Sequence, residues 1–438
     1  MAQKSFYVDG YGYFIYDSLT NHIITVSDAS LSLFVDNENL CKSQKNEMCC
    51  IEWSSTFNEL KCSIDDSLTT LVLQLTRNCN LRCKYCAYSG EFDNMLPHSR
   101  EKMTLDIIYK SIDFFMEHSK NSLEIIIIFY GGEPLLEFES IKKAVKYAKK
   151  YNRNIRFGIS SNGTLLSPVI AKWLRENPNV SITVTLNGDK HDVYRKTVEK
   201  EGSLQSILDN ITYIREQYPS VWEEQVRLIA NIYSIRELLE LREFYKTTVN
   251  KQPVMITRIN LEYSSEQLKE IFCANEALEK KCNYELQNEY LNSYDSFLRL
   301  VYNNGIDRIH NRGVCKEDTP GFISSCLPMS WRLFVRSDGS FNMCEKVSDA
   351  ISLGNIYSGF NFDLIKTLYI QMEEFVNRNC KNCWAQRLCM FCYQDVINEK
   401  GQVIDSFPTE KCDTIKENIT DYLKMYIRIA NENPQSLN

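Results

Sequence analysis

The chain has 438 residues, a net charge of −7, 44% hydrophobic residues and 24% charged residues. This length predicts two or three domains, and the composition is that of a folded globular protein rather than a disordered one. The negative charge, with no basic stripe, argues against nucleic acid as a partner, because phosphate binding requires concentrated lysine and arginine. No signal-peptide pattern is present, and no apolar run reaches the roughly 18 residues of a membrane span, so we expect a cytoplasmic protein without a membrane partner.

Cysteine is the most unusual feature of the composition. The chain has 17 cysteines but only five histidines. Cytosolic proteins keep their thiols reduced, so spaced cysteines there indicate metal binding or catalysis rather than a disulfide framework. The shortage of histidine favours all-thiolate sites, which means iron-sulfur clusters or four-cysteine zinc sites.

The first predicted elements lie in residues 5–27, where aromatic and β-branched residues alternate around Gly10 and the turn "SLTNH". This pattern predicts two or three short strands. The stretch resembles the opening hairpins of the winged-helix recognition domain found in pathways for ribosomally made, post-translationally modified peptides. Such a domain binds a leader peptide as an added strand. We therefore expect residues 1–65 to form a small β-rich, winged-helix-like module that binds a leader peptide, with a simple β-cap on the following barrel as the alternative.

From residue 69 the pattern changes to six apolar strand runs separated by amphipathic helices such as 104–119 and 140–151. The pattern predicts an α/β fold with a parallel sheet, open or curved into a partial (β/α)6 TIM-type barrel over residues 66–264. Ligand chemistry should collect at the C-terminal ends of its strands. A helical bridge (265–312) and a cysteine-rich C-terminal domain (313–438), stabilised by metal rather than by a large apolar core, should follow. The strand runs are 69–75, 123–130, 155–161, 180–187, 226–233 and 254–263.

Three cysteines directly follow the first barrel strand, in "TRNCNLRCKYC". Cys79, Cys83 and Cys86 could hold three irons of a 4Fe-4S cluster and leave the fourth iron open. A zinc site completed from elsewhere is the alternative from these residues alone. The stretch "CNLRCKYC" resembles the CxxxCxxC loop of the radical S-adenosylmethionine (SAM) enzymes. This resemblance implies that the open iron binds the amino and carboxylate groups of SAM, and that Tyr85 lies against the adenine.

The end of the second strand run, "YGGEPLL", resembles the GGEP element of the same family. The resemblance implies that Tyr130, Gly131, Gly132 and Glu133 belong to the SAM site. Glycine lacks a Cβ, so the backbone of this turn could approach the methionyl group closely. Glu133 would accept a hydrogen bond from the methionine ammonium group.

Two further strand ends resemble family elements. "SSNGTLL" is similar to the ribose-side loop of the family, which implies SAM contacts from Ser161 and Asn162. "TLNGDKHDVYR" is similar to the "SLDG…HD..R" element, but threonine stands where serine is usual, Asn187 replaces aspartate, and the spacing to the arginine is two residues short. The resemblance implies that Arg195 binds the SAM carboxylate with Thr185 nearby; an exposed surface arginine is the alternative.

The C-terminal cysteines follow the pattern of the SPASM domain, which they resemble. Cys326 is followed by Gly339-x4-Cys344, and a CxxC-x5-CxxC block is followed by a distant last cysteine. In the usual pattern the block ends in Cx3C, whereas here only two residues separate the last pair. The block and the last cysteine are Cys380, Cys383, Cys389, Cys392 and Cys412.

The resemblance implies two auxiliary 4Fe-4S clusters, for a total of three. The first would use Cys326, Cys344 and Cys392, with Cys315 as a possible fourth ligand; without Cys315, its open iron could bind a substrate thiolate. The second would use Cys380, Cys383, Cys389 and Cys412. Two zinc knuckles are the alternative. Glu345 stands where related sulfatase-maturing enzymes carry a general base, or is simply a solvated glutamate. The other cysteines, which we expect to be buried or free thiols, are Cys41, Cys49, Cys50, Cys62, Cys273 and Cys282.

These resemblances imply a radical SAM peptide maturase of the thioether-forming sactipeptide or ranthipeptide type. It would make a 5′-deoxyadenosyl radical, remove a hydrogen from a carbon of a cysteine-containing precursor peptide, and form a bond to a cysteine sulfur. An electron donor such as flavodoxin or ferredoxin and an anaerobic or low-oxygen organism would be expected. The alternatives are formylglycine formation in a sulfatase, carbon-carbon cross-linking, and a non-catalytic peptide-binding or electron-transfer protein.

Overall fold

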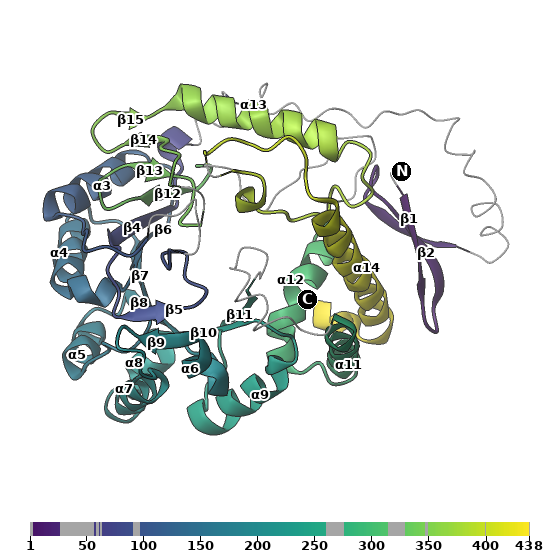
Figure 1. Ribbon diagram of the computed structural model, residues 1–438, viewed down its shortest axis with the longest axis horizontal. Coiled ribbons are helices and arrows are strands. Elements are labelled where there is room, and N and C mark those ends of the chain that lie inside the picture. The colour runs from purple at the N-terminus through teal and green to yellow at the C-terminus, as the bar shows by residue number, and fades with distance from the viewer. Residues whose placement is uncertain are drawn as a thin grey trace.

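Figure 1 shows a computed structural model of the chain, in which a curved parallel sheet carries helices on its outer face. The structure describes residues 3–26, 57, 61, 64–90, 97–259, 276–313, 329–346, 349–398 and 400–437. The main sheet has the strand order β11-β10-β8-β7-β6-β4-β12-β13. Its predicted strands are β4 (Thr70–Thr76), β6 (Ile125–Gly131), β7 (Ile155–Ser161), β8 (Val180–Thr185), β10 (Val226–Ile232) and β11 (Met255–Arg258).

All six predicted strands are present, pair in parallel and lie in chain order across the sheet. The partial (β/α)6 barrel is therefore confirmed. β4 is buried along its whole length, as expected for a parallel strand covered on both faces. The helices that follow the strands are α3 (Leu105–Glu117), α4 (Phe138–Lys149), α5 (Pro168–Glu176), α6 (His191–Tyr194), α7 (Leu204–Gln217), α8 (Pro219–Glu224) and α9 (Glu237–Phe244).

The C-terminal region contributes to the barrel sheet directly. β12 (Arg332–Val335) pairs in parallel with β4, and β13 (Phe341–Asn342) pairs with β12. Side chains of these strands and of α13 (Phe362–Asn379) belong to the same apolar core as the barrel strands. The expectation that this region lacks a large apolar core is therefore wrong, while its stabilisation by metal stays a prediction.

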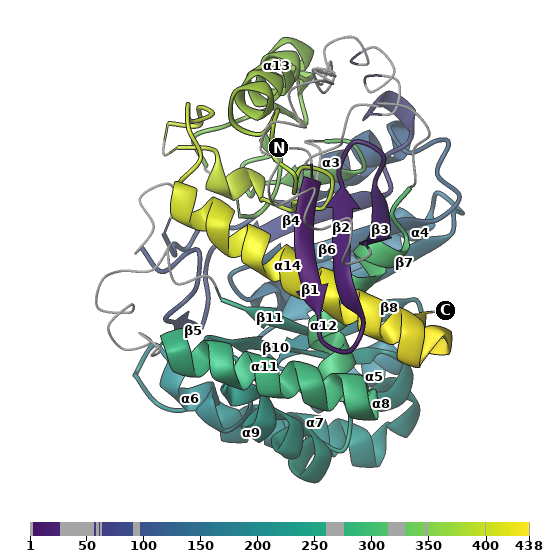
Figure 2. The same ribbon diagram turned by 90° about the vertical axis from the view of Figure 1, so that its right-hand side faces the viewer.

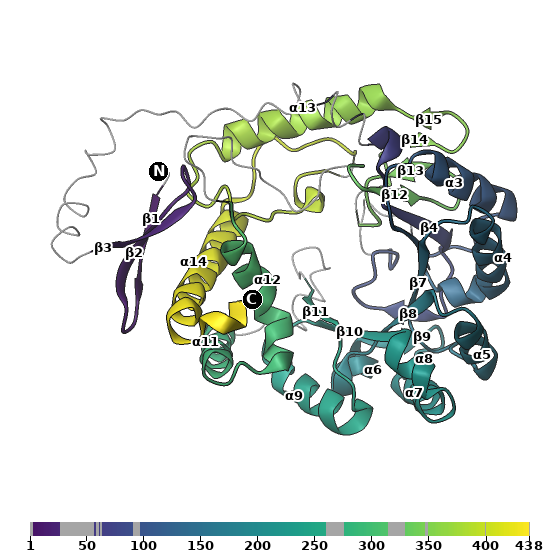
Figure 3. The same cartoon turned by 180° about the vertical axis from the view of Figure 1, so that it is seen from behind.

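Three further helices complete the region opposite the barrel strands (Figure 3). α11 (Glu276–Ser293) and α12 (Ser296–His310) lie in the predicted helical bridge, and α14 (Thr409–Glu432) lies near the C-terminal end of the sequence. Helix α12 packs on α14. Among the described residues, no helix has both the length and the apolar composition needed to cross a membrane. The remaining short elements are β5 (Leu81–Cys83), β9 (Arg195–Thr197), β14 (Gly354–Asn355), β15 (Gly359–Phe360), η2 (Pro134–Glu137), η3 (Gly188–Lys190), η4 (Tyr245–Val249), η6 (Tyr393–Asp395) and η7 (Pro434–Leu437).

The N-terminal strands form a separate antiparallel sheet in the order β1-β2-β3, as predicted. The strands are β1 (Gln3–Val8), β2 (Gly12–Asp17) and β3 (His22–Val26). Figure 2 shows this sheet lying across α14, and its buried residues share an apolar cluster with α14 and α12. The described sheet therefore packs on these two helices, and its role as a leader-binding module or a β-cap stays a prediction. Residues 27–56 lie outside the described residues.

Candidate active site and cysteine centres

The three-cysteine loop leaves the C-terminal end of β4 and is fixed by a short antiparallel ladder. β5 pairs with β9, and this pairing places Cys83 directly opposite Arg195. The amide of Lys84 also donates to the carbonyl of Tyr194 at 2.9 Å. The backbone of the loop is therefore ordered by protein contacts, and Arg195 is brought beside the cysteines as predicted.

The thiols of this loop lie in a poorly solvated environment. Cys79 is 8% exposed, and its sulfur accepts a hydrogen bond from the Leu81 amide at 3.4 Å. Burial raises the pKa of Cys79 to about 11 and that of Cys86 to about 12, and the nearby charge of Cys83 adds to both shifts. Iron would replace these protons, because the thiolate is the ligand form. Three neighbouring thiols from one loop fit the donor set of a cluster with three protein ligands.

The GGEP turn packs directly on the cysteine loop. The Gly132 amide donates to Thr76 O at 2.7 Å, and the Glu133 amide donates to Asn78 O at 2.9 Å. A Cβ at Gly131 would lie 2.2 Å from Thr76 O, and one at Gly132 would lie 2.1 Å from Asn78 O. In the described structure, these two glycines therefore permit close approach to the protein backbone. A contact of the turn with the methionyl group stays a proposal.

Glu133 joins the GGEP turn to the end of β7. Its side chain is fully buried and accepts hydrogen bonds from the Leu135 amide (3.0 Å), the Ser161 hydroxyl (2.9 Å) and the Asn162 amide (2.7 Å). Burial raises the pKa of Glu133, and the hydrogen bonds oppose this shift. A carboxylate has about four acceptor positions, so three are already used by the protein. The predicted ammonium contact would use the remaining one.

Asn162 connects the β7 loop with the cysteine loop. Its side-chain nitrogen, Nδ2, donates to Asn80 Oδ1 at 2.8 Å and lies 3.7 Å from the sulfur of Cys79. Its side-chain oxygen accepts from the amide and the hydroxyl of Thr164. The structure therefore brings Ser161 and Asn162 together with the GGEP turn and the cysteines, at the edge of the sheet where the sequence predicted a site.

Tyr85 is the centre of a polar network that the sequence only partly revealed. Its hydroxyl accepts from Arg195 Nη1 (2.9 Å), Asn187 Nδ2 (2.9 Å) and, more weakly, Asn231 Nδ2 (3.4 Å). Arg195 is only 5% exposed, so the alternative of a surface arginine is wrong. Its Nε has no hydrogen-bond partner among the described residues. A buried donor without a partner is costly, and a bound carboxylate could accept from it. Asn231 was missed because a lone asparagine at a strand end gives no signal.

His191 stabilises the segment that leads to Arg195. It is fully buried; Nδ1 accepts from the Asn187 amide at 3.2 Å, and Nε2 lies 3.1 Å from Ser203 Oγ. Burial, with a smaller contribution from the charge of Arg195, lowers the pKa of His191 to about 2. The imidazole is therefore neutral in the folded protein at physiological pH.

This shift predicts a specific loss of stability in acid. The unfolded histidine binds a proton below about pH 6.5, whereas folded His191 does not, so stability falls by about 1.4 kcal/mol per pH unit as pH drops below that value. Urea unfolding at pH 6.5 and 5.5 checks this. His191→Gln should show a smaller decrease in the free energy of unfolding than the wild type, by about 1 kcal/mol. Equal decreases in the two proteins would contradict the assignment.

Tyr130 lies at the junction between the barrel and the C-terminal region. Its ring packs edge-on against Phe334 of β12, with 6.4 Å between the ring centroids. Burial raises the pKa of Tyr130 well above its usual value, and the charge of Glu345 adds to the shift. Tyr88, Cys86 and Cys344 raise this pKa further. Thr185 ends β8 with a partly buried side chain.

Glu345 is engaged by the protein rather than solvated. Its Oε2 accepts from Arg332 Nη2 at 2.7 Å and from the thiol of Cys344 at 3.3 Å. Burial and the charge of Glu345 raise the pKa of Cys344 to about 12. The described contacts of this carboxylate therefore fix Cys344. Its predicted role as a general base stays a proposal.

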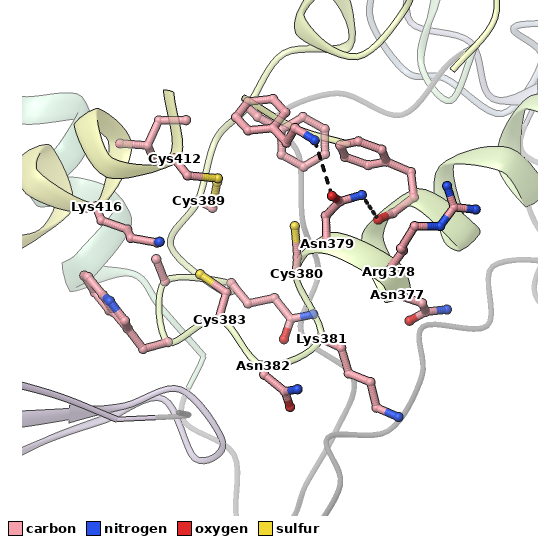
Figure 4. Close-up of a pocket in the computed structure, with 17 residues that line it drawn as sticks. Asn377, Arg378, Asn379, Cys380, Lys381, Asn382, Cys383, Cys389, Cys412 and Lys416 are labelled. Carbon is pink, nitrogen blue, oxygen red and sulfur yellow. Dashed lines mark hydrogen bonds between the residues drawn. The ribbon is translucent and has the colours of Figure 1, made fainter. Parts of the chain in front are cut away.

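Four cysteines of the C-terminal block line one cavity of about 420 Å³. Figure 4 shows them with Lys416 around this cavity. Cys380 ends α13, Cys412 lies in the first turn of α14, and the other two lie in the connecting loop. Burial raises the pKa of Cys380 to about 12, and the three other thiols add to the shift. The four are Cys380, Cys383, Cys389 and Cys412, which is the set predicted for the second auxiliary cluster.

The predicted first auxiliary set is only partly described. Cys315 and Cys326 lie outside the described residues, while Cys344 is partly buried and Cys392 is exposed. Of the unassigned cysteines, only Cys282 is described, and it is partly buried. Within the described ranges, no three His, Cys, Asp or Glu side chains are grouped as the ligands of one metal ion. The thiol-only donor sets of the loop and of the cavity fit iron-sulfur clusters by their chemistry.

Comparisons with known proteins agree with this arrangement. Residues 73–229 match the family model described as the Radical SAM superfamily. A cysteine-type anaerobic sulfatase-maturating enzyme of Clostridium novyi (strain NT) is 26% identical over 346 residues, which cover 74% of this chain and 87% of that protein. The solved structure of native anSMEcpe with bound AdoMet is 20% identical, with a TM-score of 0.62, and the match covers 83% of this chain and all of that one. The same protein with bound AdoMet and the Cp18Cys peptide has a TM-score of 0.60, 20% identity, and coverage of 83% and 99%.

The family model begins within β4 and ends within β10, so it includes the three-cysteine loop, the GGEP turn and the Asn162 loop. The family implies that SAM and a 4Fe-4S cluster are cofactors, and the three-thiol loop fits that cluster. The chain is therefore an enzyme that contains a radical SAM domain in residues 73–229.

Proposed function

We propose that this enzyme forms a thioether cross-link in a ribosomally made precursor peptide that contains cysteine. The observation that carries the proposal is that β12 of the C-terminal region pairs with β4, the strand that leads into the three-cysteine loop, and that Phe334 of β12 packs on Tyr130 of the neighbouring strand. The C-terminal cysteine region would therefore adjoin the site at which the radical forms. The fold is shared with a structure solved with a bound peptide, which supports a peptide as the substrate class.

The following roles are proposed for residues of this chain. In this family, a reduced 4Fe-4S cluster with bound SAM supplies a 5′-deoxyadenosyl radical. Cys79, Cys83 and Cys86 would hold that cluster, and the free Nε of Arg195 would bind the SAM carboxylate. The buried network around Tyr85 would fix the nucleoside and keep water away from the radical.

The C-terminal cysteines would hold the two auxiliary clusters, so that the enzyme carries three. Cys344 would belong to the first, and its contact with Glu345 and the Arg332 pair behind it would fix its position. The precursor would bind through a leader segment, and flavodoxin or ferredoxin would supply electrons.

The proposed reaction has a simple mass balance. One C–H bond and one S–H bond of the peptide are replaced by one C–S bond, so the peptide loses two hydrogens per cross-link. One leaves as a hydrogen atom and ends in 5′-deoxyadenosine; the other leaves as a proton, and the remaining electron would pass to an auxiliary cluster. Co-expression with a short cysteine-containing precursor peptide, followed by mass spectrometry, tests this. We expect the peptide to lose two hydrogens and one alkylatable thiol per cross-link. With a Cys79→Ala/Cys83→Ala/Cys86→Ala variant, we expect the peptide mass and the number of thiols to stay unchanged. An unchanged peptide mass would contradict the proposal.

A second candidate is the oxidation of a sulfatase cysteine to formylglycine. The specific observation that favours it is the match to the C. novyi maturating enzyme across most of both chains. Incubating the reduced enzyme and SAM with a cysteine-type sulfatase peptide separates the two, because formylglycine is an aldehyde and reacts with hydrazine probes. A hydrazine-reactive product would favour this candidate over cross-linking.

A further inference from the structure

The N-terminal sheet and the loop that carries two cysteines of the second set lie directly against each other. This loop, residues 383–389, runs from Cys383 to Cys389. We propose that the N-terminal sheet positions this loop, with Arg387 as the positioning residue, so that the sheet and the second cluster form one structural unit. The inference rests on the proposed assignment of that cluster.

Arg387 makes the direct link. It lies between the two cysteines, and its guanidinium donates to two carbonyls of the turn between β2 and β3: Nε to Ser18 O at 2.6 Å, and Nη2 to Leu19 O at 3.1 Å. Ser18 is fully buried. Two bonds from one planar guanidinium fix both the position and the direction of the loop, which a single contact could not do.

Apolar contacts reinforce this link. Ala385 and Leu388 are 1% and 4% exposed, and they belong to one cluster with Phe6 and Tyr16 of the sheet. The ring of Trp384 packs edge-on against Tyr16, with 6.3 Å between the centroids. Every residue from 384 to 388 except Gln386 thus contacts the sheet or shares its cluster. The same cluster includes Ile309 of α12 and Leu423 of α14, so the loop packs in a core that the sheet shares with these two helices.

Helix α12 and the residues that follow it also contact this loop and the β2–β3 turn. Arg308 Nη2 donates to Cys389 O at 3.0 Å. Just beyond the helix, Arg312 Nε donates to Asn21 O in the β2–β3 turn at 2.9 Å. The loop, the turn and the end of α12 therefore form one hydrogen-bonded unit, and removing one contact loosens the other two.

The functional consequence concerns the cluster rather than the fold of the barrel. Groups outside the ligand shell orient the ligands and set how far solvent reaches the metal site. The potential of an iron-sulfur cluster depends on such solvent exposure and on hydrogen bonding. Loosening the loop should therefore expose Cys383 and Cys389 and change the potential of the second cluster, while the cluster at Cys79, Cys83 and Cys86 stays unchanged.

The test compares Arg387→Ala and Arg387→Lys with a matched control, Arg378→Ala. Arg378 also lines the cysteine cavity, but it is 53% exposed and pairs with the exposed Asp405. In iron-free protein kept anaerobic, we expect Arg387→Ala to speed alkylation of Cys383 and Cys389 about tenfold, with Cys83 and Cys86 unaffected. Arg387→Lys should restore part of the protection, and Arg378→Ala should match the wild type.

In the reconstituted protein, an EPR-monitored redox titration should show a shifted potential for the second cluster in Arg387→Ala only. Alkylation rates and potentials equal to those of Arg378→Ala would overturn the positioning role. A wild-type protein that binds no iron at its C-terminal cysteines would overturn the cluster assignment instead. The alkylation measurement needs no iron, so it separates these two failures.

Discussion

Replacing Cys79, Cys83 and Cys86 together by alanine should abolish the formation of 5′-deoxyadenosine from SAM. The loop from Thr76 to Gly90 contains no other cysteine and no histidine, so it offers no replacement ligand for the radical SAM cluster. The C-terminal cysteines form a separate cavity, so their iron should remain bound. Chromatographic assay of 5′-deoxyadenosine and iron analysis of the anaerobic protein check both parts.

Cys282→Ala is the control for this experiment. Cys282 is a partly buried cysteine of α11, outside both cysteine groups, so its loss should leave product formation and iron content unchanged. A triple variant that still forms 5′-deoxyadenosine would refute the assignment of the loop.

Gly132→Ala should cause the second large effect. The added Cβ would lie 2.1 Å from the carbonyl oxygen of Asn78, which belongs to the backbone and cannot rotate away. The GGEP turn would have to move off the cysteine loop, which should lower the free energy of unfolding by about 3 kcal/mol. A displacement of about 1 Å in a catalytic loop can cost roughly 100-fold in rate, and we expect a loss of that order in SAM cleavage. Denaturant unfolding and the 5′-deoxyadenosine assay measure the two effects.

Gly158→Ala is the matched control, because it adds the same methyl group to a neighbouring strand. Its Cβ would meet Ile128 Cγ1 at 3.7 Å, an ordinary contact distance. Stability should change by less than about 1 kcal/mol, and SAM cleavage should remain. If Gly132→Ala behaves like Gly158→Ala, the close approach of the two loops is not needed for function.

The barrel strands were predictable because each one carries a local signal. The runs around Leu71, Ile127 and Ile182 are short, apolar and rich in β-branched residues, as parallel strands covered on both faces must be. Strand ends of a parallel sheet meet at one edge, so the cysteine loop, the GGEP turn and the Asn162 loop could be placed together before the structure was known. The contacts among them confirm this placement.

The contacts between distant segments were not predictable in the same way. β12 has only four residues and pairs with β4 across more than 250 positions of chain, which leaves no local pattern in the sequence. The N-terminal strands were predicted, but their packing on α14 was not, because the apolar face of a sheet does not specify what covers it. The apolar periodicity of α13, at Ile365, Leu368 and Met372, was present in the sequence but was missed among the dense cysteines.

In the site, too, contacts between distant segments could not be predicted from the sequence. Arg195 has an unusual spacing from its motif, yet the β5–β9 ladder places it opposite Cys83, because strand register rather than sequence distance sets its position. Glu133 could be assigned to the site from its motif, but its three hydrogen bonds to the protein depend on how two loops pack.

The most direct measurement is the EPR spectrum of the reduced, anaerobically purified protein with and without SAM. A cluster held by only three cysteines leaves one iron for the cosubstrate, so SAM should change the signal of one cluster. That same signal should be absent from the Cys79→Ala/Cys83→Ala/Cys86→Ala protein. A spectrum that SAM leaves unchanged, in a protein whose iron sites are full, would contradict the account.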